Sequence, residues 1–244
     1  MAEAIDTRNG ARERIVDAAA ALLSEGGQAA VTTRAVAERA GVQAPAIYRL
    51  FGDKDGLLDA VTEHVMTGFA TAKAAAVAGS GRVDPVEDLR LGWDMTIDFG
   101  LANPDLYVLL SDPARGQRSA ATQAGIRLLA ERVHRVALTG RLRVSEEDAV
   151  ELIHAAGTGA ILTILGRPAA QRDRRLADSM FDAVLHRILA AADAPRDATK
   201  ANAIAPAVAL RAHTEQVHAL SPGERALLAE WLERIIEVER AAGR

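Results

Sequence analysis

Residues 32–51 read Thr-Thr-Arg-Ala-Val-Ala-Glu-Arg-Ala-Gly-Val-Gln-Ala-Pro-Ala-Ile-Tyr-Arg-Leu-Phe, and this stretch decides the fold. It predicts two short helices joined by a turn at Gly41, because glycine adopts the left-handed backbone of such a turn most easily. The small residues Ala37 and Ala40 let the crossing helices approach closely. The inward-facing set is expected to be Val36, Val42, Ile47 and Phe51. This pattern indicates a helix-turn-helix, whose second helix enters the major groove of DNA.

The sequence on both sides of this stretch also predicts helices. Proline and capping residues mark several starts, notably at Asp84-Pro85, Ser145 and Ser221-Pro222, and Gly26–Gly27 marks a stop. We expect helices over about residues 8–24, 33–40, 43–50, 54–77, 85–101, 104–111, a stretch that ends before 140, 145–165, 174–192, 206–219 and from 221 onward. Residues 193–205 read as a linker. The chain is therefore predicted to be all-α.

Composition narrows the classes of protein further. The chain has 244 residues, no cysteine and 3% aromatic residues, so cysteine-ligated metals, disulfides and thiolate nucleophiles are excluded. No signal peptide and no apolar run of about 20 residues is visible, so we expect a cytoplasmic protein without a membrane partner. The net charge is −4, so any affinity for DNA must come from local positive charge. Residues 31–54 carry four cations (Arg34, Arg39, Arg49 and Lys54) against Glu38 and Asp53, a local charge of +2.

The span from Arg12 to Val65 resembles the DNA-binding domain of the TetR family of repressors. The matching residues are Thr32-Thr33-Arg34, Val36-Ala37, Ala40-Gly41-Val42, Tyr48, Phe51, Lys54 and Leu57-Leu58. The resemblance implies an N-terminal three-helix domain that binds double-stranded operator DNA, followed by a larger helical domain that dimerises and binds a small-molecule effector. It implies a homodimer on a pseudo-palindromic operator, released by the effector, and no cofactor.

The expected DNA contacts follow from this resemblance. They are Thr32, Thr33, Arg34, Gln43, Ala44, Pro45, Ala46, Tyr48, Arg49 and Lys54. Thr33, Tyr48 and Lys54 would hold phosphates, and Arg34 would reach a guanine edge. Lys54 also stands out because a cation at a helix N-terminus opposes the helix dipole unless an anion binds there. Leu50 departs from the family, which usually has a histidine or aromatic residue there, so one phosphate contact is in doubt.

The rest of the chain is expected to form the regulatory part. We predict a DNA-binding domain over residues 1–52, an effector-binding and dimerisation domain over 53–195, and a helical extension over 196–244. The predicted dimer interface is Ile153, Gly157, Ala160, Ile161, Ile164, Met180, Val184 and Ile188, on the two helices before the linker. The predicted effector pocket is Trp93, Phe99, Leu106, Tyr107, Leu110, His154 and Thr158. The extension could pack on its own subunit or reach over the partner.

Two other classes of protein remain open from the sequence. Glu-x-x-His occurs three times, at Glu131/His134, Glu151/His154 and Glu215/His218. In di-metal helical bundles this spacing places two ligands on one helix face, but it also occurs in ordinary surface pairs, and we assign no metal ligand. A helical adaptor with a vestigial DNA-binding domain is the second alternative. No phosphate-binding loop, dinucleotide fingerprint or nucleophile elbow is present, and no enzyme is expected.

Overall fold

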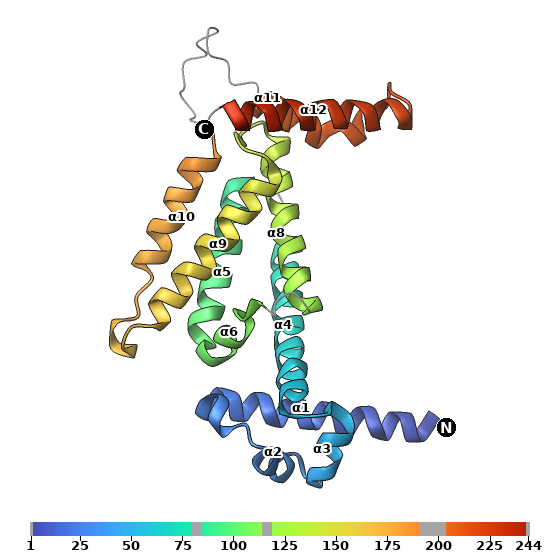
Figure 1. Ribbon diagram of the computed structural model, residues 1–244, viewed down its shortest axis with the longest axis vertical. Coiled ribbons are helices and arrows are strands. Elements are labelled where there is room, and N and C mark those ends of the chain that lie inside the picture. Colours follow the sequence, from blue (N-terminus) through green and yellow to red (C-terminus); the bar gives the residue numbers. More distant parts are fainter. Residues whose placement is uncertain (1, 80–83, 114–118, 191–203, 243–244) are drawn as a thin grey trace. The chain divides into compact units, whose positions relative to one another are not determined.

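The computed structural model describes residues 2–79, 84–113, 119–190 and 204–242, and within these ranges it is helical without strands (Figure 1). The helices are α1 (Ala2–Ala30), α2 (Thr33–Ala40), α3 (Ala44–Phe51), α4 (Lys54–Gly79), α5 (Pro85–Ala102), α6 (Pro104–Leu110), α8 (Ala120–Leu138), α9 (Glu146–Leu165), α10 (Arg175–Ile188), α11 (Ile204–His213) and α12 (Pro222–Ala242). Short 3-10 turns follow α9 (Ala169–Gln171) and α11 (Thr214–Gln216). The all-α prediction is confirmed.

The capping signatures begin helices where the sequence predicts them. The Asp84 carboxylate accepts the Val86 N–H at 2.9 Å at the start of α5, and this hydrogen bond, more than the ion pair with Arg141, holds the pKa of Asp84 below its usual value. The Ser145 hydroxyl accepts the Asp148 N–H at 3.0 Å and caps α9. These bonds satisfy N–H groups that have no partner within their own helix.

Three helix ends differ from the prediction. Helical turns continue past Gly26–Gly27 to Ala30, although both glycines have non-helical backbone angles. Helix α10 ends at Ile188 because Leu189 is extended (φ −94°, ψ 143°) and forms an isolated bridge with Leu142. Helix α11 ends at His213, before the 3-10 turn, and not near residue 219. Most of the predicted linker, 193–203, lies outside the described residues.

The chain forms two compact units. Unit 1 comprises residues 1–79 and 98–125, and unit 2 comprises residues 80–97 and 126–244. This division assigns α4 and α6 to the same unit as α1–α3. The core of unit 1 contains Ile15, Ala19, Leu23, Val36, Ile47, Leu57, Leu58, Val61 and Leu106. Burial of apolar side chains from five helices, α1–α4 and α6, therefore fixes the helix-turn-helix on α1 and α4.

Unit 2 contains two antiparallel helix pairs, α9 with α10 and α11 with α12 (Figure 1). Phe181 of α10 is fully buried, and its ring centroid lies 4.9 Å from that of Trp93 on α5. By length and composition alone α9 could cross a membrane, but one face of it packs on α10, as in a core helix. Helix α12 exposes a row of large apolar side chains, Leu227, Trp231, Ile235 and Val238.

Candidate nucleic-acid interface

The turn between α2 and α3 has the geometry that the sequence predicts. Gly41 adopts φ 65° and ψ 37°, and the Val42 N–H donates to the Ala37 carbonyl at 3.0 Å. A Cβ built on Gly41 would meet no atom within 4 Å. Glycine is therefore favoured here for its left-handed backbone and not for space.

The inner side of the motif fixes the direction of α3. Val36 and Ile47 are buried, and Val42, Leu50 and Phe51 are partly buried against the core of unit 1. Leu50 thus packs at the position where the family resemblance implied a contact with the DNA backbone. With this side of α3 held by apolar contacts, its opposite side faces solvent.

The outer side of α3 carries the predicted reading residues. Gln43, Pro45, Tyr48 and Arg49 are exposed, while Ala44 and Ala46 are half-buried. Gln43 precedes the helix, yet its side chain makes no capping hydrogen bond, which leaves the amide available to a ligand. A helix that presents short and polar side chains in this way fits a major groove closely.

The predicted phosphate-binding residues lie at the edges of this surface. Thr33 Oγ1 and the Tyr48 hydroxyl are 3.4 Å apart and join the start of α2 to α3. Thr32 is exposed, and its hydroxyl accepts the Ala35 N–H at 3.2 Å as the cap of α2. Lys54 Nζ donates to the Gln28 carbonyl at 3.3 Å. This carbonyl is a partner that the sequence did not reveal, and two further N–H donors of the lysine remain for a phosphate.

The local positive charge is concentrated on three side chains. Arg39 forms a bidentate ion pair with Glu25, at 2.8 and 2.9 Å, and the hydrogen bond to Glu25 raises the pKa of Arg39. Arg34 and Arg49 are exposed, and neither forms an ion pair within the described part of the chain. The cations available to DNA are therefore Arg34, Arg49 and Lys54.

The predicted effector residues divide between the two units. Phe99, Leu106, Tyr107 and Leu110 belong to unit 1, where Phe99 stacks on Phe69 at 4.2 Å. Trp93, His154 and Thr158 belong to unit 2. Trp93 is buried, whereas His154 is exposed with a pKa lowered by partial desolvation. A pocket formed by all seven stays a prediction.

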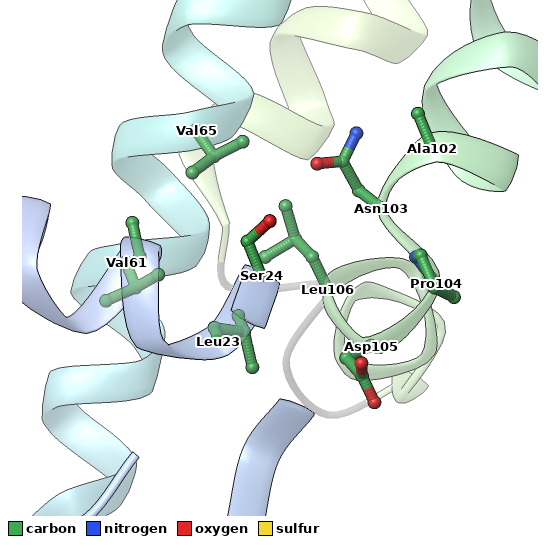
Figure 2. A pocket seen from close by; sticks show the side chains of 10 residues that line it. Leu23, Ser24, Val61, Val65, Ala102, Asn103, Pro104, Asp105 and Leu106 are labelled. Carbon is green, nitrogen blue, oxygen red and sulfur yellow. The ribbon is translucent and has the colours of Figure 1, made fainter. Parts of the chain in front are cut away.

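Unit 1 contains a hollow of its own between α1, α4 and the α5–α6 junction (Figure 2). Its empty volume is about 390 Å³, part of which is open to solvent. Leu23, Val61, Val65 and Leu106 supply apolar walls, and Ser24, Asn103 and Asp105 supply polar groups. Of the predicted effector residues, Leu106 alone lines it. The Asp105 carboxylate also lies beside Gly27, where a Cβ would come within 3.0 Å of it.

The predicted dimer residues lie mostly in the core of unit 2. Ile153, Gly157, Ala160, Ile161, Ile164, Val184 and Ile188 are all buried within the single chain, so they expose little surface to a second subunit, and their role in a dimer stays a prediction. Met180 alone of the predicted set is exposed, at 37%. The opposite side of α9 exposes Leu152, Ala155, Gly159 and Leu162, spaced three, four and three residues apart. We call this set the α9 stripe.

The described residues contain no group of three or more His, Asp or Glu side chains placed to hold a metal ion. His134 pairs with Glu146 across α8 and α9, at 3.1 Å, and not with Glu131. The di-metal alternative therefore has no support in the part of the chain that the structure describes.

Comparison with known proteins gives the same classification for the N-terminal region. Residues 15–61 match the family model described as bacterial regulatory proteins, tetR family. The tetracycline repressor protein class C of Escherichia coli is 46% identical over 56 residues, which is 23% of this chain and 26% of that protein. The transcriptional regulator BetI of Paraburkholderia xenovorans is 36% identical over 81 residues, 32% of this chain and 40% of that protein. The chain thus matches well under two thirds of the length of these relatives.

Solved structures resemble a larger part of the fold. A putative transcriptional regulator from Saccharomonospora viridis, in complex with choline, has a TM-score of 0.61 at 15% identity and covers 74% of this chain and 98% of its own. A putative tetR family regulator from Shewanella sp. PV-4 has a TM-score of 0.56 at 21% identity and covers 74% of this chain and 99% of its own. Each of these two comparisons leaves about a quarter of this chain unmatched.

Proposed function

Because its N-terminal helix-turn-helix is a domain of the tetR family of bacterial regulatory proteins, we propose that the chain is a transcriptional repressor that binds operator DNA as a homodimer. A small molecule that binds outside the helix-turn-helix releases the repressor from the operator. Residues 1–52 bind DNA, residues 53–195 bind the effector and dimerise, and residues 196–244 form an extension. The protein acts in the cytoplasm.

One observation carries this proposal: α3 is held by buried Ile47 while Gln43, Pro45, Tyr48 and Arg49 face solvent. Three exposed cations belong to α3 or to the helices directly before and after it, namely Arg34, Arg49 and Lys54. Phosphate contacts position a protein on the duplex, whereas contacts to base edges give specificity. We assign Arg34 to a base edge, and Thr33, Tyr48 and Lys54 to phosphates.

The α9 stripe is the proposed dimer surface. Leu152 and Leu162 are each 38% exposed, and the small residues Ala155 and Gly159 between them allow a second helix to approach closely. A Cβ on Gly159 would meet no atom within 4 Å, so the surface at its centre is open. Pairing of two copies through this stripe and Met180 is isologous, as two-fold symmetry requires.

Control by the effector follows from thermodynamic linkage between effector binding and DNA binding. Two recognition helices read a pseudo-palindrome only when they lie about one DNA turn apart, ~34 Å or a multiple. A ligand that binds better to another arrangement of the dimer weakens DNA binding by its difference in affinity for the two states. The choline complex of the S. viridis regulator supports a small-molecule site in this fold.

The experiment is selection of genomic DNA fragments on the purified full chain, followed by fluorescence anisotropy with the enriched fragments. We expect an inverted repeat, bound by a dimer, with an affinity that falls steeply as salt rises. Absence of any enriched sequence would contradict the proposal.

A further inference from the structure

Unit 2 buries an arginine whose hydrogen bonds are largely unmade. Arg132 of α8 is 1% exposed. Its Nε donates to Asp88 Oδ2 at 3.3 Å, an atom that also accepts Nη2 of Arg135 at 2.5 Å. Within the described residues, Arg132 Nη1 and Nη2 and Asp88 Oδ1 have no hydrogen-bond partner. Four N–H bonds of a buried guanidinium are thus unmatched, which is rare and costly in a native core.

The guanidinium lies against the backbone of α5. A Cβ on Gly92 would come within 2.9 Å of both Cζ and Nη1 of Arg132. Any larger residue at this position of α5 would displace the charged group. Glycine is a poor residue for a helix interior, so its presence here matches the space that the guanidinium occupies.

The charge of the buried Arg132 guanidinium is only partly compensated by nearby acids. Asp88 is buried but is shared with Arg135, and Glu131, the other acid that acts on Arg132, is exposed to solvent. Burial lowers the pKa of Arg132, and the nearby Asp88 carboxylate opposes this effect. A buried guanidinium whose charge is only partly compensated favours a bound counter-charge.

Aromatic surface lies next to this group along α5. Trp93 follows Gly92 and is buried, and its ring centre lies 4.9 Å from that of Phe181, with the two rings tilted by 33°. Its Nε1–H has no partner in the described part of the chain either. Arg90 lies 4.8 Å from the ring centre of Phe181 and pairs with Asp182, so a further cation is already on this ring.

We propose that Arg132 anchors a site in unit 2 for a small organic carboxylate with an apolar body. The two Nη groups match the two oxygens of a carboxylate in a bidentate pair, and the apolar body contacts the Trp93–Phe181 pair. The site stands on this geometry, whereas its role as the effector site rests on the function proposed above. A cation such as choline is disfavoured by Arg132, Arg135 and Arg90.

The test uses the full chain with Trp231→Phe, which leaves Trp93 as its single tryptophan. Octanoate and benzoate are titrated against octanamide, benzamide and choline, with Trp93 fluorescence and thermal unfolding as readouts. We expect at least one carboxylate to bind tenfold or more tightly than its amide, and choline to have no effect. Equal binding of acid and amide, or binding of neither, overturns the proposal.

Substitutions of Arg132 distinguish a loss of carboxylate binding from a loss of folding. Arg132→Lys keeps the charge but loses the bidentate geometry and is expected to weaken carboxylate binding at least tenfold. Arg132→Met should abolish the preference for acid over amide, while Arg127→Met, at an exposed position of the same helix, should keep it. Circular dichroism confirms that each variant is folded. Retention of the preference by folded Arg132→Met, or undiminished carboxylate binding by folded Arg132→Lys, contradicts the assignment.

Operator binding distinguishes this site from the proposed function. Binding of a carboxylate through Arg132 without any change in DNA affinity supports the site and removes its effector role. Absence of DNA binding by the unliganded protein contradicts the repressor proposal. The titration with carboxylates and amides still tests the Arg132 site, because it does not depend on DNA binding.

Discussion

Arg34 is the residue on which base recognition is proposed to depend. It is exposed at the first turn of α2 and forms no ion pair in the described part of the chain. We expect Arg34→Ala to cost about 1–3 kcal/mol of DNA binding and to relax preference at one base pair in each half-site. Anisotropy with single-base operator variants measures both effects. Unchanged affinity and preference would exclude Arg34 from base contact.

Lys54 is proposed to contact phosphate, a role that carries no sequence preference. Lys54→Ala should weaken binding to all DNA sequences by a similar factor and reduce the slope of log affinity against log salt by about 1. Because Lys54 also bonds to the Gln28 carbonyl, thermal unfolding of the variant is measured in parallel. A selective loss on one sequence would point to base contact instead.

At Gly56 the surrounding atoms leave no space for a side chain. Its Cβ would lie 2.1 Å from the Phe51 carbonyl oxygen, so Gly56→Ala must distort the α3–α4 turn. We expect a loss of about 1–3 kcal/mol or more in the free energy of unfolding by urea. Gly68→Ala in the same helix is the control. A Cβ on Gly68 meets nothing within 4 Å, and alanine there should stabilise the protein by up to about 1 kcal/mol.

Among the helices, α9 carries the surface through which we propose that the chain dimerises, the α9 stripe. Gly159→Arg adds a long, charged side chain to an open surface of the monomer. We therefore expect it to shift the protein from dimer to monomer without lowering its thermal stability at low concentration. Sedimentation velocity measures the change, and Gly68→Arg on exposed α4 is the matched control. A dimer that survives Gly159→Arg would place the interface elsewhere.

The sequence predicts where helices begin better than it predicts which side of a helix is buried in its own chain. Helix starts at Asp84, Ser145 and Ser221 were predictable because capping is local chemistry. Helix α9 is different because it is apolar on two sides, with Ile153, Ile161 and Ile164 on one and Leu152 and Leu162 on the other. Periodicity cannot tell which side meets its own chain, so the sequence does not separate residues of the core from residues of a dimer interface on this helix.

The ends of helices are also hard to predict from local sequence. Helix α10 was expected to continue to residue 192, since alanine favours helix. Instead, the Ala190 N–H donates to the Arg141 carbonyl at 2.8 Å. A partner nearly fifty residues away overrides local preference here, and no local pattern records it. Likewise, the Gln28 carbonyl beside Lys54 is a backbone group that residue types cannot reveal.

At the scale of the whole molecule, the resemblance fixes only the N-terminal part. The helix-turn-helix could be predicted residue by residue because its spacing is specific over some twenty positions. The effector residues could not, because large apolar side chains such as Leu106 and Trp93 are equally suited to a core. Unit 2 in fact buries Trp93, and among its buried polar groups without a partner is the guanidinium of Arg132, a charge at helical spacing between Leu129 and Val136.

The central claim is tested by a DNase footprint of the 244-residue chain on its selected genomic fragment. We predict protection of two half-sites related by a dyad, with centres about 10 base pairs or a multiple apart. The same footprint should vanish when Gln43 and Arg49 on the exposed side of α3 are both replaced by Glu. Protection that lacks a dyad, or that survives this double substitution in a folded protein, would contradict the claim that α3 reads the operator.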